Sequence, residues 1–198
     1  IPVPGAAIGA KLTYRLEVTQ LALDGTDNPD AHAPLSGKHE VTVEGPQSTF
    51  RVTLMPFKYN ADGSGRLPDT SEAAVEKYRN RLLQLYPVSN VEVTVHEPLT
   101  WNAAIRADGT GWDTVLGRLI DLRSQENLPD DAYYYGIFLP DDTFDSYCGF
   151  GCLLGLSLLN TDPPETGNVD LRMAIGVAYD IYTFDTAAHE LGHAHGRL

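Results

Sequence analysis

The first 46 residues alternate apolar and polar side chains in short runs, with the period of two that is typical of a half-buried β-strand. The pattern is clearest at residues 12–18 and 40–44. Between these runs, residues 24–30 are rich in Asp, Asn, Gly and Pro, which indicates a turn-rich loop. We therefore expect residues 1–46 to form a short β-rich segment, which is either a pro-segment remnant or the end of a preceding β domain.

From about residue 47 the pattern changes, and strands alternate with amphipathic helices. Five strands are predicted, at residues 50–57, 91–95, 133–139, 153–159 and 171–178. Three helices are predicted: one that runs to about residue 86, one at 112–125, and one from 183–186 to the end of the chain. Asp69 and Glu72 form a capping pair that starts the first helix, and Pro87 ends it.

The order of these elements predicts an α/β (α+β) fold for a domain that comprises residues 47–198. Helices that connect strands return the chain in the same direction, so the first three strands should be parallel. No helix is predicted between the last two strands, which indicates that residues 153–159 form an antiparallel edge strand. We expect a mixed, mostly parallel five-stranded sheet with covering helices.

The last helix carries the residues with the clearest chemistry, in the sequence His189-Glu-Leu-Gly-His193-Ala-His-Gly196. Residues four positions apart lie on the same face of a helix, so His189 and His193 can bind one zinc ion. Glu190 lies one step round the helix, where its carboxylate can act as a general base toward a metal-bound water. Gly196 is placed to end the helix, because Gly adopts left-handed backbone angles without steric cost.

This segment resembles the H-E-x-x-H-x-x-G-x-x-H signature of the metzincin zinc endopeptidases. The resemblance implies that His189 and His193 are zinc ligands, that Glu190 is the catalytic base and that Gly196 forms the turn after the helix. The third His of the signature would stand at position 199, directly after Leu198. The third ligand, the Met-turn and the lower subdomain of the family are thus expected beyond that residue. A gluzincin, whose third ligand is a Glu on a later helix, is the alternative family, and Gly196 argues against it.

The order of elements extends the resemblance to residues 47–198, which would form a metzincin-like upper subdomain with the active-site helix at its end. In that family the edge strand binds the peptide substrate by β-augmentation. The matching residues here are Gly155, Leu156 and Ser157. The resemblance thus implies a protein or peptide substrate and Zn²⁺ as the cofactor.

Composition and charge exclude some functions. Lys and Arg number 14 against 27 Asp and Glu, a net charge of −13, so the chain has no basic stripe with which to bind nucleic acid. Its longest apolar runs are far shorter than the roughly 20 residues of a membrane span. Residues 124–171 lack Lys and Arg and are acid-rich, which indicates a solvated acidic face, a calcium site or a preference for cationic peptides. The loop at residues 24–30 is a second candidate for Ca²⁺.

The two cysteines, Cys148 and Cys152, lie four positions apart in a Gly-rich loop. They form a short-range disulfide, remain as two free thiols, or pair with a cysteine beyond Leu198. A disulfide would indicate an oxidising compartment, and we expect a secreted protein, although the sequence shows no signal peptide. The other histidines receive structural interpretations: His195 is expected to contact carboxylates or solvent, and His96 to lie at the surface.

Two functions remain open at this point. The first is a secreted zinc-dependent endopeptidase that hydrolyses peptide bonds with a metal-activated water and Glu190 as the general base. The second is a secreted adhesion or binding module in which the helix motif is a vestigial or incomplete metal site. The acid-rich stretch further predicts that a peptidase would prefer Lys- or Arg-rich peptides. The sequence does not indicate an oligomeric state.

Overall fold

The computed structural model describes residues 11–17, 32–42, 49–126, 129–149, 151–159, 169–180 and 182–196. It divides the chain into two compact units, residues 1–47 and 48–198, which we describe separately. The predicted boundary after residue 46 differs from this division by one position. The predicted loop at residues 24–30, with its candidate calcium site, lies outside the described residues.

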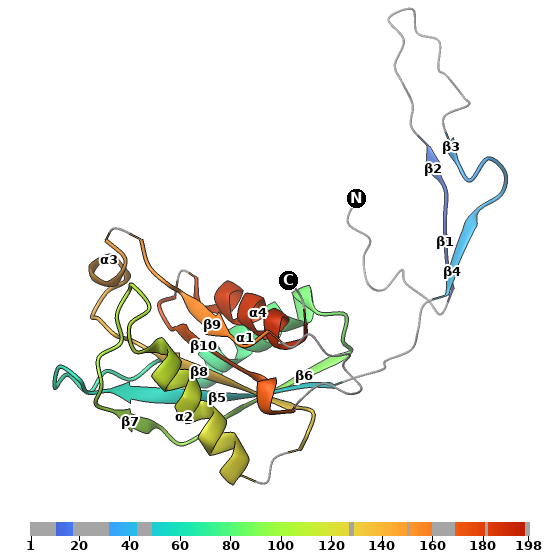
Figure 1. Cartoon of the computed structure of the whole chain (residues 1–198). Coiled ribbons are helices and arrows are strands. Elements are labelled where there is room, and N and C mark those ends of the chain that lie inside the picture. Colours follow the sequence, from blue (N-terminus) through green and yellow to red (C-terminus); the bar gives the residue numbers. More distant parts are fainter. Residues whose placement is uncertain are drawn as a thin grey trace, which may run out of the picture. The chain divides into compact units, whose positions relative to one another are not determined.

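The first unit contains two short antiparallel ladders (Figure 1). Strand β1 (Lys11–Tyr14) pairs with β4 (His39–Thr42), and β2 (Leu16–Glu17) pairs with β3 (His32–Ala33). Strands were predicted here, but their side chains are not half-buried as expected, since Tyr14 and Leu16 are 42% and 56% exposed. The described residues of this unit form two-stranded ladders, and these residues include no second layer on which such side chains could pack.

The second unit is built on a six-stranded, mostly parallel sheet (Figure 1). Its strands are β5 (Thr49–Tyr59), β6 (Asn90–Val95), β7 (Leu99–Trp101), β8 (Ala132–Phe138), β9 (Gly155–Ser157) and β10 (Met173–Val177). The hydrogen-bonded order is β6-β5-β8-β10-β9, and β7 pairs with the end of β5. All pairs are parallel except β9 with β10, so the predicted antiparallel edge strand is confirmed.

The prediction of five strands was wrong by one. The additional strand, β7, has only three residues, which is too few to show a period of two. It extends the sheet along β5 beyond the point where β6 ends. The edge strand is shorter than predicted, because only residues 155–157 of the expected 153–159 pair with β10. Residues 169–171 form a 3₁₀ turn, so β10 also starts later than predicted.

The described residues contain four α-helices: α1 (Glu72–Leu85), α2 (Trp112–Gln125), α3 (Phe144–Tyr147) and α4 (Thr183–Ala194). The sequence predicted all but α3, a single turn that is too short for a periodic pattern. The predicted capping pair was wrong, because Ser71 caps α1 by accepting a hydrogen bond from the Ala74 backbone N–H at 3.3 Å. Asp69 instead accepts one from the Ser71 backbone N–H at 2.8 Å and shapes the preceding turn.

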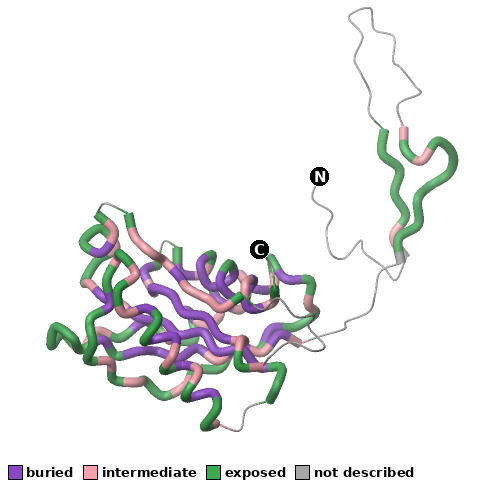
Figure 2. Tube along the Cα trace, viewed as in Figure 1, coloured by how far each residue is buried: buried purple, intermediate pink, exposed green. Residues whose placement is uncertain are grey.

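Helices cover both faces of the sheet, so its central strands are buried on both sides (Figure 2). Each of the seven residues of β8 is buried, as expected for a central parallel strand. The core on the face of α1 and α4 includes Tyr78, Leu82, Tyr133, Tyr135, Ile137, Ala187 and Leu191. The core on the face of α2 includes Trp112, Leu119, Tyr134 and Phe138. The mixed α/β class is therefore confirmed, and α4 lies on the same face as α1.

Candidate metal centre

Helix α4 follows β10 closely, and side-chain hydrogen bonds fix its position on the sheet. At its first residue, the Thr183 hydroxyl donates to the backbone carbonyl of Tyr179 at 2.5 Å. Near its middle, the Ala188 carbonyl accepts a hydrogen bond at 2.7 Å from the hydroxyl of Tyr86, which directly follows α1. These bonds join α4 to the loop before it and to α1, so the helix turn that carries the candidate ligands is held from two sides.

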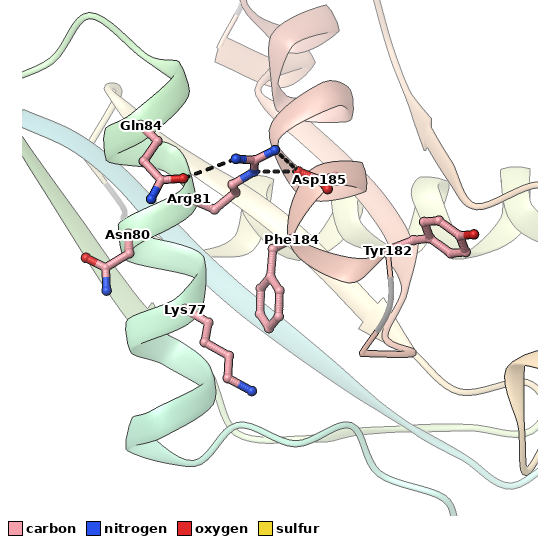
Figure 3. A pocket seen from close by; sticks show the side chains of 7 residues that line it. All are labelled: Lys77, Asn80, Arg81, Gln84, Tyr182, Phe184 and Asp185. Atoms are coloured by element: carbon pink, nitrogen blue, oxygen red, sulfur yellow. Dashed lines mark hydrogen bonds and ion pairs between the residues drawn. The ribbon is translucent and has the colours of Figure 1, made fainter. Parts of the chain in front are cut away.

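An ion pair between Arg81 of α1 and Asp185 of α4 adds a further link (Figure 3). Arg81 also donates to the side-chain oxygen of Gln84 at 3.1 Å, and the Lys77 ammonium lies 5.7 Å from the centre of the Phe184 ring. These residues line an open pocket of about 270 Å³. The Arg81 and Asp185 side chains are 37% and 60% exposed, so the ion pair orients α4 more than it stabilises the fold.

His189 and His193 lie next to each other on one face of α4. Their Nε2 atoms are 3.1 Å apart, and their ring centres are 4.6 Å apart. Two nitrogen ligands of one tetrahedral zinc ion, each at about 2.0–2.1 Å from the metal, would lie about 3.3 Å apart. The observed separation therefore fits two corners of a zinc site. The pair adjoins a pocket of about 340 Å³ that is also lined by Leu85, Tyr86 and Gly192.

Glu190 lies on the sheet side of α4, and only 8% of the residue is exposed. Burial raises the pKa of its carboxyl group to about 7, an effect that the neighbouring His193 partly offsets. The side chain rests against the edge strand, since a Cβ atom added to Gly155 would lie 2.4 Å from Glu190 Cγ. The structure thus places Glu190, the predicted base, in contact with Gly155, a residue of the predicted substrate strand. Glycine has no side chain, so the two residues can approach closely.

Gly196 ends the helix in the way the sequence predicted. Its φ angle is +82°, in the left-handed region that residues with a side chain rarely adopt. Its backbone N–H donates to the carbonyl of His193 at 2.8 Å and so closes the last turn. The helix therefore ends within three residues of the second histidine, on a turn that favours glycine.

The described part of the chain contains no group of three or more His, Cys, Asp or Glu side chains that could hold a metal ion. His195 does not join the histidine pair, because its ring stacks on Tyr133 with centres 4.3 Å apart. Its Nδ1 donates to the Leu191 carbonyl at 2.7 Å, and the Phe50 ring packs edge-on at 4.9 Å. The sequence led us to expect carboxylates or solvent around His195, and it gave no indication of these aromatic neighbours.

His96, which we expected at the surface, is partly exposed and also makes a specific contact. Its side chain is 27% exposed, and its Nε2 atom bonds to a carboxylate oxygen of Glu126 at 2.9 Å. The Tyr134 hydroxyl donates to the other oxygen of the same carboxylate. His96 therefore links the segment after β6 to the end of α2, a contact between positions 30 residues apart that local sequence does not reveal.

Cys148 and Cys152 form a disulfide in the loop before β9, with their Cα atoms 5.0 Å apart. This settles the alternatives in favour of the short-range bridge. Directly after the bridge, the Leu153 backbone N–H donates to the Ala107 carbonyl at 2.9 Å. The Leu153 carbonyl accepts a hydrogen bond from the Tyr147 hydroxyl at 2.7 Å. The loop is thus fastened immediately before the edge strand begins.

The acid-rich stretch is partly neutralised by a cation from another segment. The Arg66 guanidinium donates to the Asp142 carboxylate at 2.8 Å and to the Leu139 and Pro140 carbonyls at 3.1 and 2.7 Å. The described residues of this stretch contain no cluster of the kind that binds calcium. Of the three interpretations of the stretch, the structure gives no support to a calcium site within these residues.

Comparisons with known proteins add no family. No protein-family model matches the chain, and no curated protein is significantly similar to it. None of the helices in the described ranges combines the length and the hydrophobicity that a membrane span requires. The structure itself defines a mixed α/β domain in which one helix presents two histidines beside a buried glutamate.

Replacing Tyr86 with phenylalanine should lower the free energy of unfolding by about 1 kcal/mol, because the Ala188 carbonyl loses a buried hydrogen bond. Urea denaturation of the two proteins would measure the difference. The matched control is Tyr182→Phe, since Tyr182 is 43% exposed and its hydroxyl should be replaceable at no cost. Equal stability of the wild type and Tyr86→Phe would show that this bond does not hold α4.

Proposed function

We propose that this protein is a secreted zinc-dependent endopeptidase of the metzincin type. The observation that carries the proposal is the 3.1 Å separation of the Nε2 atoms of His189 and His193, with Glu190 buried beside them. The left-handed turn at Gly196 and the antiparallel edge strand next to α4 support the same family. The disulfide supports secretion, because such bridges persist in oxidising compartments.

In this proposal His189 and His193 hold the zinc ion together with a third ligand that follows Leu198. When bound, zinc lowers the pKa of a water molecule and stabilises negative charge on the substrate carbonyl. The Glu190 carboxylate accepts a proton from the attacking water and passes it to the leaving amine nitrogen. The burial of Glu190 against Gly155 keeps its carboxylate out of bulk water and near the bound peptide.

Strand β9 provides the peptide-binding edge in this proposal. Among the described strands it pairs with β10 alone, so the other edge of Gly155, Leu156 and Ser157 can accept an extended peptide as a further strand. Main-chain hydrogen bonds of this kind do not select a sequence. The expected preference for Lys- or Arg-rich peptides therefore rests on the negative charge of the surrounding stretch.

The alternative is a secreted adhesion or binding module with an incomplete metal site. It needs no ligand beyond the two histidines, and the described residues contain no group of three metal-binding side chains. The two functions differ in what they require of the residues that follow Leu198, because only the peptidase needs a further ligand there.

The test is zinc binding and zinc-dependent cleavage by the natural polypeptide, including whatever residues follow Leu198. We expect one zinc ion per chain and cleavage of an unfolded protein that stops with a chelator and returns with added zinc. His193→Ala should weaken zinc binding by more than about 100-fold, since even residues that only support a zinc ligand contribute 10–100-fold. Calorimetric titration with zinc would measure this effect.

The matched control is His96→Ala, which removes a half-buried histidine whose bonds are to Glu126 and to the Glu97 carbonyl. It should bind zinc as tightly as the wild type. A wild-type protein that binds no zinc and cleaves nothing would overturn the peptidase proposal and favour the binding module.

A further inference from the structure

Two glycines face each other at the edge of the sheet, next to the candidate site. Gly155 of β9 and Gly176 of β10 are direct partners in the antiparallel register, and β9 lies beside α4 (Figure 1). Directly opposed residues of an antiparallel pair point to the same face of the sheet. The glycine pair therefore leaves a gap in the layer of side chains, on the face that α4 covers.

Two polar side chains occupy this gap. An added Cβ at Gly155 would lie 2.5 Å from Glu190 Oε1, and an added Cβ at Gly176 would lie 2.1 Å from the hydroxyl oxygen of Tyr135. Neither position could hold even alanine unless a neighbour moved. Glu190, the base of the proposed reaction, and the Tyr135 hydroxyl thus lie against two adjacent glycines. We call the space above Gly155 and Gly176, under α4, the glycine slot.

The Tyr135 hydroxyl has no hydrogen-bond partner among the described residues, although Tyr135 is fully buried at the centre of β8. Burial raises the pKa of this hydroxyl well above its usual range, and the neighbouring Tyr78 and Glu190 raise it further, so it stays protonated and remains a donor. A buried donor without an acceptor is rare in native proteins and calls for an explanation. The negative charge of Glu190 is therefore close enough to act on the Tyr135 hydroxyl.

We propose that Tyr135 is a positioning residue for Glu190. Its hydroxyl donates a hydrogen bond, through one water molecule in the glycine slot, to one oxygen of the Glu190 carboxylate, so that the other oxygen is held toward the attacking water. Each of the two oxygen atoms lies within 2.5 Å of one of the two opposed Cβ positions, so the hydroxyl and the carboxylate are neighbours in the slot, where one water can bridge them. This role rests on the proposed peptidase function for its kinetic consequence, but the hydrogen bond itself does not depend on zinc.

Tyr135→Phe removes only the hydroxyl and is the variant that tests the proposal. We expect kcat to fall about tenfold, with KM and zinc affinity unchanged, because the carboxylate is still present but less well oriented. The matched control is Tyr78→Phe. Among the described residues the Tyr78 hydroxyl is also buried without a hydrogen-bond partner, and its ring contacts Tyr135. Burial raises its pKa, and the carboxylates that add to this effect are Asp180 and Asp69. Tyr78→Phe should therefore cleave at the wild-type rate.

A second measurement is independent of cleavage and uses the metal-free protein. The infrared band of the Glu190 carboxyl group is identified as the band that Glu190→Gln removes. We expect this band to shift in Tyr135→Phe and to stay in place in Tyr78→Phe, because only the first variant takes a hydrogen bond from Glu190. A purely structural role of Tyr135 would leave both the band and kcat unchanged.

The two measurements separate failure of this inference from failure of the proposed function. If the wild type cleaves protein but Tyr135→Phe has a wild-type kcat or an unshifted band, the positioning role is wrong and the peptidase proposal stands. If the wild type neither binds zinc nor cleaves, the peptidase proposal is wrong, and the infrared comparison alone decides whether Tyr135 bonds to Glu190.

Discussion

Replacing Glu190 with glutamine should slow peptide cleavage by about 10²–10⁴-fold while zinc stays bound. Glutamine has nearly the same shape as glutamate, so it fits the space against Gly155. Its amide, however, does not accept a proton from the attacking water at neutral pH. His189 and His193 are unchanged in this variant, and we expect their zinc affinity to be preserved. Initial cleavage rates and the zinc content of the same samples would measure the two effects.

The matched control is Glu97→Gln, which makes the same change at an exposed glutamate that follows β6. It should cleave at the wild-type rate. A wild-type rate in Glu190→Gln would show that Glu190 is not the base. Loss of zinc from Glu190→Gln would instead assign this residue to metal binding.

The candidate ligands could be predicted from the sequence because their relation is local. His189 and His193 lie one helical turn apart, and a helix fixes the distance between such residues whatever surrounds it. The turn at Gly196 is local in the same sense, since a single φ angle decides it. The two long helices α1 and α2 follow from periodicity over 14 residues each, which is enough to define an apolar face.

The surroundings of the site could not be predicted, because they depend on contacts between distant segments. The contact of Gly155 with Glu190 joins β9 to α4, and that of Tyr135 with Gly176 joins β8 to β10. In the sequence, Tyr135 is one residue in an apolar run, with nothing that marks its hydroxyl as unpartnered. The glycines gave a weak signal, since an isolated glycine in a strand often marks a close approach of another group.

The aromatic surroundings of His195 were missed for the same reason. Phe50 and Tyr133 belong to β5 and β8, far from His195 along the chain, and the sheet brings them under the end of α4. Spacing along the helix showed only that His195 lies on a different face from His193. The residues that this face contacts depend on the order of the strands in the sheet. Strand order follows from the packing of the complete domain, so a local sequence pattern does not reveal it.

Replacing Gly155 with valine is the second change for which we expect a large effect. The new Cβ would lie 2.4 Å from Glu190 Cγ, so either Glu190 or the edge strand must move. Valine has a high propensity for β-strands, so a loss of cleavage activity in this variant cannot be assigned to a lower strand propensity. We expect cleavage to fall at least about 100-fold, because a misplacement of about 1 Å at a catalytic group can cost that much. Overpacking should lower the free energy of unfolding by about 1–3 kcal/mol.

Leu156→Val is the matched control for this experiment. It places valine at the next position of the same strand, where the side chain points to the opposite face and packs in the core under α2. It should cost about 1 kcal/mol of stability. Cleavage should stay near the wild-type rate, because Leu156 offers a bound peptide its main chain, which this substitution leaves unchanged. Cleavage rates and urea denaturation of both variants would then show whether activity depends on the space above Gly155 or on the stability of β9. If Gly155→Val and Leu156→Val lose activity equally, the strand as a whole matters and the close approach of Glu190 to Gly155 does not.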